Sequence, residues 1–506
     1  MRRTLWTILC LINAGWACAQ TLYAPGERHS GMQSPIYAAV DGNPAQTTYE
    51  KGPLWNTGSN RQYQTIQAAI DDSNAGDVIV VAIGSHSGPG NRDIDFKGRA
   101  VTLRSVEPLD PLVVAATVID CGGSNTDPHR GFFFHTGEDA NAVVDGLTIT
   151  NGAGCYDGGA VKCWNHSSPT IRNCLITGNL SGGRAGGIFC AHYSNPAITN
   201  CIFTGNAATT GYGGAICCFD NSSPTITDCI MTDNGAMGSG HHGGAVYCHD
   251  AGNATLVNCF ISGNTAGHRG GGFSAYWSDP TLINCTIVGN ASLEGGGVSS
   301  FRQSNPTLVN CIIRENRALD GPQIALINTI RIWGVSIPTE MTVLFCDVQG
   351  GSAAATVDAS CTLNWGQGNI DLDPQFVEPG YWSDANAPWD ANYSDYVVGD
   401  FHLPPDSPCV NAGDNTSIPA AVTRDLDGEQ RVFAERVDLG ADEAVAEIAD
   451  LNGDGVVDFL DLAVLADEWL KNAAGLRADF SENGRVELSD YTHLARWWKW
   501  TAKWRR

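Results

Sequence analysis

The chain has 506 residues, with 29 lysines and arginines against 54 aspartates and glutamates, so its formal net charge is −25. Nucleic acids and anionic membrane surfaces carry charge of the same sign and repel such a chain, which argues against nucleic acid as a partner. Only 16% of the residues are charged while 59 are glycine, a composition that favours a turn-rich β architecture over a helical bundle.

The N-terminal residues have the pattern of a secretory signal peptide. Two arginines precede an apolar run from Leu5 to Trp16, and Ala17-Cys18-Ala19 then offers a small-x-small cleavage site. Lipid attachment at Cys18 is an alternative. No other apolar run is long enough to span a membrane. We therefore expect a signal peptide at 1–19, an N-terminal segment at 20–60, and a secreted or cell-surface protein without an integral membrane segment.

A segment of about 27 residues occurs six times in tandem. Its most regular column is a cysteine, at intervals of 27, 28, 30, 26 and 26 residues: Cys174, Cys201, Cys229, Cys259, Cys285 and Cys311. Two asparagine-rich columns have the same intervals: Asn173, Asn200, Asp228, Asn258, Asn284 and Asn310, then Asn179, Asn206, Asn234, Asn264, Asn290 and Asn316. A repeat of this length predicts a solenoid, a propeller or an array.

Local alternation decides between these architectures. The inward-facing parity changes between Asn173 and Cys174, so the strand must turn a corner there, and asparagine tolerates the left-handed backbone of a tight bend. Stacked asparagine amides can also hydrogen-bond from coil to coil. A third strand follows each Gly-Gly pair, as at Gly158-Gly159. Short strands with bends between them and no helical periodicity predict a parallel β-helix.

In such a fold the cysteine column is an inward stack of small apolar side chains, about 4.8 Å apart. A bond between two side chains that both project straight inward would be strained, so we expect free thiols in this column. Four cysteines lie off the repeat columns and are the better candidates for disulfides, in a pairing that the sequence leaves open: Cys121, Cys155, Cys361 and Cys409.

The segments Tyr63 to Ile70, Gly76 to Val81 and Val101 to Ser105 resemble the first helix and first coils of the right-handed parallel β-helix (pectin-lyase-like) superfamily of secreted bacterial proteins. The resemblance implies an all-β right-handed parallel β-helix solenoid over 61–345, with the helix capping its open end. It implies closing coils and a C-terminal cap over 346–443, followed by a linker at 444–449. Acidic residues of the closing region, as in Asp425-Leu-Asp-Gly428, are expected as turn formers, with calcium binding as the alternative.

Two twelve-residue loops near the C-terminus have the pattern of calcium loops, with oxygen side chains at positions 1, 3, 5, 9 and 12 and a main-chain carbonyl at position 7. Hard oxygen ligands select Ca²⁺, which should fold this module on binding. The expected ligand residues are Asp450, Asn452, Asp454, Val456, Asp458, Asp461, Asp479, Ser481, Asn483, Arg485, Glu487 and Asp490.

Each loop leads into an amphipathic segment, and paired loops that end in aspartate resemble a type I dockerin over 450–498, a small α-helical paired calcium-loop domain. The resemblance implies a cohesin-like partner. Positions 10 and 11, which contact the partner in that family and are often small hydroxyl residues there, are here Phe459-Leu460 and Leu488-Ser489. A cell-surface partner is therefore the alternative. Residues 499–506 form a basic aromatic tail.

No complete catalytic motif of a polysaccharide lyase or glycoside hydrolase is present, so catalytic residues stay unassigned and activity as an enzyme stays open. One further column stands out five residues after each aligned Gly-Gly pair, at a parity that should face outward. We expect its rings to contact an extended sugar chain, with burial under turns as the alternative. The column comprises Trp164, His192, Phe219, His249, Tyr276 and Phe301, and the first candidates for acid or base roles are Lys162, Asp220, His249 and Asp250.

These observations predict a secreted, calcium-binding β-helix protein that degrades or binds extracellular polysaccharide and carries a dockerin-like module for attachment. The enzyme hypothesis follows from the resemblance, since such folds often host lyases and hydrolases. The alternative is a non-catalytic surface adhesin, a carbohydrate-binding solenoid or a structural spacer. Clustered carboxylates beside a basic residue would favour the enzyme, whereas aromatic rings alone would favour the binding protein.

Overall fold

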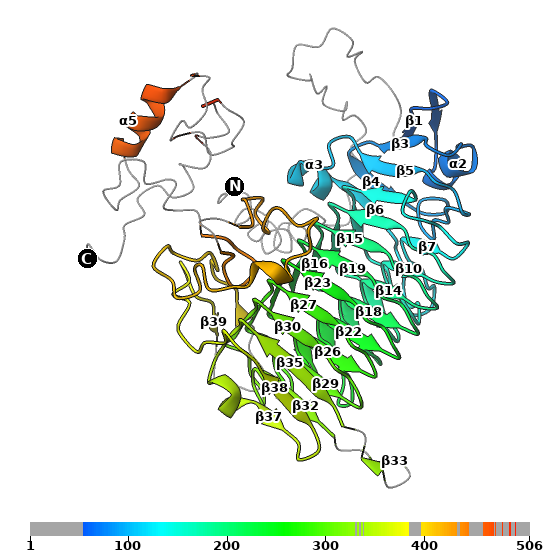
Figure 1. Cartoon of the computed structure of the whole chain (residues 1–506). Helices are drawn as coiled ribbons and strands as arrows, with labels where there is room; N and C mark the ends of the chain where they lie inside the picture. Colours follow the sequence, from blue (N-terminus) through cyan, green and yellow to red (C-terminus); the bar gives the residue numbers. More distant parts are fainter. Residues whose placement is uncertain are drawn as a thin grey trace. The chain divides into compact units, whose positions relative to one another are not determined.

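The computed structural model describes residues 54–328, 331–332, 335–336, 338–383, 396–432, 436–444, 459–469, 471, 478, 485–486 and 491 (Figure 1). The chain divides into two compact units, one with the described residues 54–444 and one with the described residues 459–491. Within the described residues, none of the helices is long and apolar enough to cross a membrane.

The first unit is a solenoid of three long sheets (Figure 1). In pairing order, the first sheet contains β2 (Arg61–Tyr63), β1 (Leu54–Asn56), β3 (Val78–Val81), β5 (Thr102–Ser105), β8 (Val143–Asp145), β11 (Thr170–Arg172), β15 (Ala197–Thr199), β19 (Thr225–Thr227), β23 (Thr255–Val257), β27 (Thr281–Ile283), β30 (Thr307–Val309), β35 (Glu340–Leu344) and β38 (Thr362–Trp365). The second contains β4 (Gly84–Ser87), β6 (Thr117–Asp120), β9 (Thr148–Thr150), β12 (Leu175–Thr177), β16 (Ile202–Thr204), β20 (Ile230–Thr232), β24 (Phe260–Ser262), β28 (Thr286–Val288), β31 (Ile312–Arg314) and β36 (Asp347–Val348). The third contains β7 (Phe132–Phe134), β10 (Val161–Cys163), β14 (Ile188–Cys190), β18 (Ile216–Phe219), β22 (Val246–His249), β26 (Phe273–Tyr276), β29 (Val298–Phe301), β32 (Ile324–Ile327) and β37 (Thr356–Val357).

Smaller elements complete the first unit. A four-stranded sheet contains β13 (Leu180–Ser181), β17 (Ala207–Ala208), β21 (Gly235–Ala236) and β25 (Thr265–Ala266), and two hairpin pairs are β33 (Arg331–Ile332) with β34 (Val335–Ser336) and β39 (Tyr381–Trp382) with β40 (Tyr396–Val397). The helical segments of this unit are α2 (Ile66–Asp71), α3 (Pro111–Ala116) and the 3-10 turns η1 (Gly351–Ala354) and η2 (Asn415–Ser417).

Strands of successive coils pair in parallel and in register, as where Val246 of β22 lies opposite Phe273 of β26. Each coil contributes one short strand to each long sheet, so the copies of the sequence repeat stack along one axis. The predicted parallel β-helix is therefore confirmed.

The predicted corners between the first and second sheets are present. Every member of the column from Asn173 to Asn310 has a positive φ, between 51° and 56°, which asparagine and aspartate adopt at lower cost than most side chains. The second column, from Asn179 to Asn316, is buried and forms a ladder. Each side-chain amide donates to Oδ1 of the next asparagine over 2.9 to 3.0 Å.

The core inside the solenoid is apolar, and the six cysteines of the repeat column point into it. None of the sixteen cysteines between Cys121 and Cys409 forms a disulfide. The expected inward stack of free thiols is confirmed. The expectation of disulfides among Cys121, Cys155, Cys361 and Cys409 is wrong. Cys121 and Cys409 are fully buried, and Cys121 packs in the solenoid core as a small apolar side chain.

The two ends of the solenoid are covered differently. Ile66, Ala69 and Ile70 of α2 are buried and belong to the solenoid core, so this helix caps the first coils as expected (Figure 1). After the last coil, the described residues of the segment 366–444 are mostly irregular and lie along the outer face of the second sheet. There Leu403 and Leu439 pack in one cluster with Ile312 of β31.

Hydrogen bonds fix this closing segment to the corner of the solenoid. The side-chain amide of Asn258 donates to the carbonyl of Arg424 (2.8 Å), and that of Asn310 donates to the carbonyl of Asp414 (3.1 Å). Within the described residues only β36, β37 and β38 extend the stack beyond residue 345. The rest of the closing segment shields apolar side chains on the outside of the second sheet from water.

The second unit contains α5 (Phe459–Glu468), which begins at the tenth residue of the first calcium-loop sequence (Figure 1). Leu465 on its apolar side is buried, as are Ala478 and Val486. The amide N–H of Ala478 donates to the carboxylate of Glu468 (2.9 Å) and joins the end of α5 to the second loop region. The signal peptide 1–19 and the tail 499–506 lie outside the described residues.

Candidate functional site

The outer side of the third sheet carries a cluster of buried and half-buried aromatic side chains, which we call the aromatic face. Side chains that point away from the core alternate with inward ones along each strand. As a result, Phe189 and Tyr247 in the middle of their strands point outward. They pack with rings two residues further along the strands in a cluster separate from the solenoid core. The aromatic face comprises Trp164, Phe189, Tyr212, Phe219, Tyr247, His249, Tyr276 and Phe301.

The predicted ring column is present for five of its six members, and its rings face outward. Phe219 pairs with His249, His249 with Tyr276, and Tyr276 with Phe301 in adjacent strands. The expectation that His192 shares this position is wrong. The pairing of Cys163 with Cys190 places Ala191 beside Trp164 and moves His192 to the next position, in line with Asp220.

The cause is a single substitution in the turn before β14. The first glycine of the pair has a positive φ in neighbouring coils, 64° at Gly158 and 68° at Gly213, but Ala185 occupies this position with a φ of 52°. The pair Gly186-Gly187 is therefore displaced by one residue, and counting from it displaces His192. The imidazole of His192 nevertheless contacts the indole of Trp164, with ring centroids 3.8 Å apart and planes at 78°.

Most rings of the column stack on one another along the solenoid axis. The centroids of Phe219 and His249 are 4.9 Å apart and those of His249 and Tyr276 are 4.3 Å apart, with planes within 20° and 6° of parallel. A ring that is sandwiched in this way presents its edge to solvent, because its two faces contact its neighbours. Phe301 is buried, and the other four members are half-buried.

Two rings at the turn after the third-sheet strands are more open. Tyr193 and Trp277 have exposed fractions of 52% and 37%. Both have a positive φ, 61° and 48°, at turn positions where neighbouring coils place Asn221 or Asp250. A left-handed backbone is costly for bulky side chains, and such strain concentrates at functional sites.

One end of the aromatic face carries a cluster of charged side chains. Arg184 donates two hydrogen bonds to the carboxylate of Asp157, at 2.8 and 3.2 Å, and Lys162 Nζ lies 3.3 Å from the same carboxylate. The Lys162 ammonium also lies 4.5 Å from the centre of the Trp164 ring. Burial lowers the pKa of Lys162, and Arg130 and Arg184 act in the same direction against Asp157.

Further charged groups of the face form separate pairs. His249 Nδ1 lies 3.0 Å from the Asp250 carboxylate, and Arg269 Nε lies 2.5 Å from that of Glu294. His192 contacts Asp220. Burial lowers the pKa of His249 although Asp250 opposes the shift.

The structure does not bring the acid and base candidates together. Asp220, His249 and Asp250 lie on adjacent coils, whereas Lys162 of β10 is separated from β22 by two intervening strands. Sequence reasoning missed Asp157 and Arg184. The sequence signal for them was a charged or histidine residue that recurs just before the glycine turn of most coils. Bridges at this position pair Asp157 with Arg184, His242 with Arg269 and Arg269 with Glu294.

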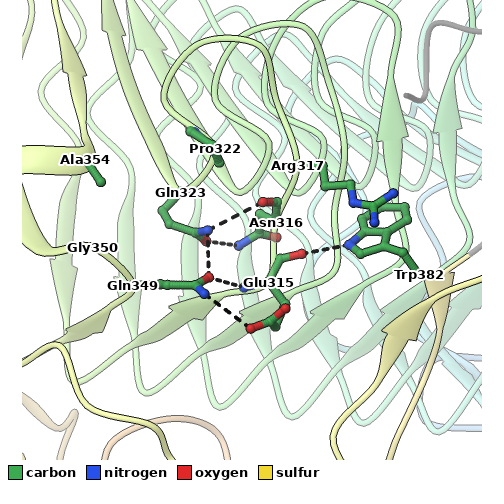
Figure 2. A pocket seen from close by; sticks show the side chains of 9 residues that line it. All are labelled: Glu315, Asn316, Arg317, Pro322, Gln323, Gln349, Gly350, Ala354 and Trp382. Atoms are coloured by element: carbon green, nitrogen blue, oxygen red, sulfur yellow. Dashed lines mark hydrogen bonds between the residues drawn. The ribbon is translucent and has the colours of Figure 1, made fainter. Parts of the chain in front are cut away.

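A pocket of about 400 Å³ lies elsewhere, beside the last coils (Figure 2). The ring of Trp382 and the guanidinium of Arg317, 4.5 Å apart, form one wall. Its polar groups bond to one another: Asn316 donates to Gln323 (2.7 Å), and Gln323 donates to Gln349 (3.1 Å). These hydrogen bonds terminate the asparagine ladder at the last coils. The side-chain amides of the pocket are therefore used by the solenoid itself and do not indicate a ligand site.

In the second unit, Asp461 is the expected twelfth residue of the first calcium loop. Its side chain is fully buried in the first turn of α5, whereas the neighbouring Leu460 is 58% exposed. A buried carboxylate at this position fits an oxygen ligand for Ca²⁺. Arg485, expected to bind through its carbonyl, has an exposed side chain. The other ten expected ligand residues lie outside the described residues.

Comparison with known proteins identifies both units. The family model described as "Right handed beta helix region" matches residues 117–245 and 239–369. The family model described as "Dockerin type I domain" matches residues 448–496. No curated protein matches the chain significantly.

Proposed function

The chain belongs to the right-handed β-helix family, and from that premise we propose that it holds an extracellular polysaccharide along its aromatic face while its type I dockerin domain attaches it to a cohesin-like partner. The observation that carries the proposal is the row of partly exposed rings and charged side chains along one face of the solenoid. Coils about 4.8 Å apart repeat these groups at a spacing suited to a long, regular ligand.

Binding is favoured over catalysis by the state of the carboxylates on this face. Asp157 accepts hydrogen bonds from Arg184 and Lys162, and the Glu294 carboxylate lies within 2.5 Å of Arg269. Asp250 pairs with His249. A hydrolase of the inverting type needs two carboxylates that share one open site with a water molecule, and the carboxylates named here are instead each paired with a basic side chain.

The ring geometry specifies how a sugar chain would be held. Tyr193 and Trp277 offer exposed ring surface that can pack on the C–H face of a pyranose. The stacked rings between them offer edges, and the paired charges beside them offer hydrogen bonds to hydroxyl groups. Basic residues on the face allow neutral or acidic sugars to approach a protein whose overall charge is −25.

The experiment is a screen of soluble and insoluble polysaccharides by affinity electrophoresis and depletion. The purified chain should bind at least one polysaccharide, and the double variant Tyr193→Ala/Trp277→Ala should bind it at least tenfold more weakly. Tyr381→Ala is the matched control, because Tyr381 is 61% exposed in β39, away from the aromatic face. Equal losses in both variants, or binding to none of the polysaccharides, would contradict the proposal.

Attachment through the dockerin domain is proposed from the family match and from Leu460. This side chain lies in the first turn of α5, at a position that contacts the partner in the dockerin family, and it is well exposed. An apolar contact with a cohesin-like partner is therefore expected. Leu460→Ser should weaken capture by a cohesin panel in the presence of Ca²⁺, whereas Trp469→Ala, at the other end of the helix, should affect it less.

A second candidate function is β-elimination on an acidic polysaccharide, with Lys162 as the base. The lowered pKa of Lys162 and the nearby guanidinium groups of Arg130 and Arg184 support it. The neutral amine would take the proton α to a uronate carboxylate, a double bond would form as the bond to the leaving sugar oxygen breaks, and a water molecule would protonate that oxygen. Unsaturated products that appear with the wild type and vanish with Lys162→Ala would favour this candidate over binding alone.

A further inference from the structure

The closing segment holds a cluster of potential metal ligands away from the aromatic face. His402 follows β40, Asp427 lies in the turn after Asp425, and Asp442 lies near the end of the described segment 436–444. One ligand atom from each of His402, Asp427 and Asp442 lies within 4.8 Å of the other two. We propose that these three side chains bind one divalent transition-metal ion, with Zn²⁺ the best fit.

The imidazole of His402 is oriented as a metal-binding histidine requires. Its Nδ1 contacts the carboxylate of Asp400, and its Nε2 faces Asp427 at 2.6 Å from Oδ2. A carboxylate on the second ring nitrogen fixes the tautomer and the ring plane of a metal-bound histidine, and it raises the basicity of the nitrogen that binds the ion. Asp400 is therefore the positioning residue of this site.

Backbone hydrogen bonds hold the two carboxylate ligands in place. Buried Asp425 accepts from the amide of Asp427 (3.1 Å) through one oxygen and from the amide of Glu443 (2.9 Å) through the other. Asp425 thus links the loop that contains Asp427 to Glu443, the residue that follows Asp442. The amide of Leu403 donates to Oδ2 of Asp442 (2.8 Å), and the second oxygen of that carboxylate leaves a lone pair for an ion.

The geometry and the ligand types select the class of ion. Nitrogen and oxygen ligands lie about 2.0 to 2.2 Å from Zn²⁺, so two ligands of one ion are roughly 3 to 4 Å apart. Ligand atoms within 4.8 Å of one another reach this arrangement by small side-chain movements. An imidazole favours Zn²⁺ and its neighbours in the first transition row, whereas Ca²⁺ takes oxygen ligands.

The charge of the cluster favours a divalent ion as well. Three carboxylates, from Asp400, Asp427 and Asp442, surround one imidazole, and an ion of charge +2 stabilises such a group more than one proton does. An ion here would join three separate parts of the closing segment. Since Leu403 and Leu439 pack against the second sheet, the ion would help to hold this segment on the solenoid.

The competing interpretation is an imidazolium ion held between Asp400 and Asp427. The chain contains a second imidazole between two carboxylates, because His129 lies 2.5 Å from Asp93 and 3.1 Å from Asp127 through its two ring nitrogens. Among the described residues, His129 has no third carboxylate close enough to form a metal-binding group with it. His129→Gln is therefore the control for His402→Gln.

The experiment uses the full chain, stripped of metal and then saturated with Ca²⁺ so that the dockerin loops are occupied. Zn²⁺ bound per chain is measured by elemental analysis after gel filtration. One equivalent is expected for the wild type and for His129→Gln, and less than a tenth of that for His402→Gln and Asp427→Asn. Added Zn²⁺ should raise the melting temperature of the wild type but not of these two variants.

A measurement on the wild type keeps the test decisive if the variants fail to fold. Co²⁺ in place of Zn²⁺ should give a visible absorption band and one paramagnetically shifted imidazole N–H signal, from the Nδ1 proton that Asp400 accepts. The proposal is overturned if the Ca²⁺-saturated wild type takes up no Zn²⁺, if no such N–H signal appears, or if the two variants fold and bind Zn²⁺ as the wild type does.

Discussion

The imidazole of His249 lies face to face with the phenol ring of Tyr276, with centroids 4.3 Å apart and planes 6° from parallel. Each ring belongs to a different coil, so the stack ties neighbouring coils together outside the core. The same contact removes ring faces from the surface that a sugar could cover. Stability and binding are therefore expected to depend on different rings of the aromatic face.

Replacing Tyr276 by Ala should mainly lower stability. The ring contacts His249 and Phe301, and its loss should cost about 3 kcal/mol, as truncation of packed aromatics does. Trp277→Ala, one residue away and more exposed, should cost less than about 1 kcal/mol and reduce polysaccharide binding instead. Denaturant unfolding of both variants checks this, and a larger loss of stability for Trp277→Ala would contradict it.

The asparagine ladder should be the most sensitive polar feature of the solenoid. Asn234→Ala removes the acceptor for Asn206 and the donor to both Asn264 and the carbonyl of Phe203, all buried. Each unsatisfied buried group costs about 1 to 3 kcal/mol. Thermal unfolding should therefore shift strongly for Asn234→Ala and little for Asn195→Ala, an exposed asparagine with one bond to Ser223. Equal shifts would count against a structural role for the ladder.

Asp347 should make stability depend on pH. Burial raises the pKa of this carboxyl from 3.8 to about 6, although Arg314 lies 3.0 Å away. The folded state therefore binds the proton more tightly than the unfolded state. This contribution is fully present below about pH 4 and is lost as the pH rises through about 6, a change of about 3 kcal/mol at most. The unfolding free energy of the wild type minus that of Asp347→Asn should fall over this pH window. A difference that does not change with pH would refute the raised pKa of Asp347.

Removal of calcium should unfold the dockerin domain and spare the solenoid. The expected ligands cluster in two short loops, and the core of the repeat is apolar and contains no expected Ca²⁺ ligand. Chelation should reduce the helical circular dichroism signal, leaving the contribution of α2 and α3, while the β signal persists. Asp461→Ala should reduce Ca²⁺ uptake in calorimetry because its buried carboxylate closes the first loop. Unchanged uptake in Asp450→Ala/Asp479→Ala would show that the loops do not bind the ion.

The repeat made the solenoid predictable to the level of single residues. A side chain that recurs once per coil has the same environment each time, so the cysteine column and the asparagine corners could be inferred from intervals alone. The position of His192 could not, because Ala185 adopts the left-handed backbone usually left to glycine and shifts the visible Gly-Gly pair by one residue. A count along the sequence has no access to that backbone choice.

The packing outside the repeat was also beyond sequence reasoning. Parity predicts that a ring points outward but not whether its face meets solvent or another ring, which depends on side-chain rotation in adjacent coils. The closing segment has no period at all. His402, Asp427 and Asp442 come together only because irregular loops fold back along the second sheet.

The most direct test of polysaccharide binding along the aromatic face is the dependence of affinity on ligand length. Calorimetric titration with oligosaccharides of increasing length, cut from a polysaccharide that binds, should show affinity rising with each added sugar until the ligand spans the face. The gain per sugar should shrink in Tyr193→Ala/Trp277→Ala and persist in Tyr381→Ala. An affinity that is already maximal for a disaccharide, or that is unchanged in the double variant, would contradict binding along this face.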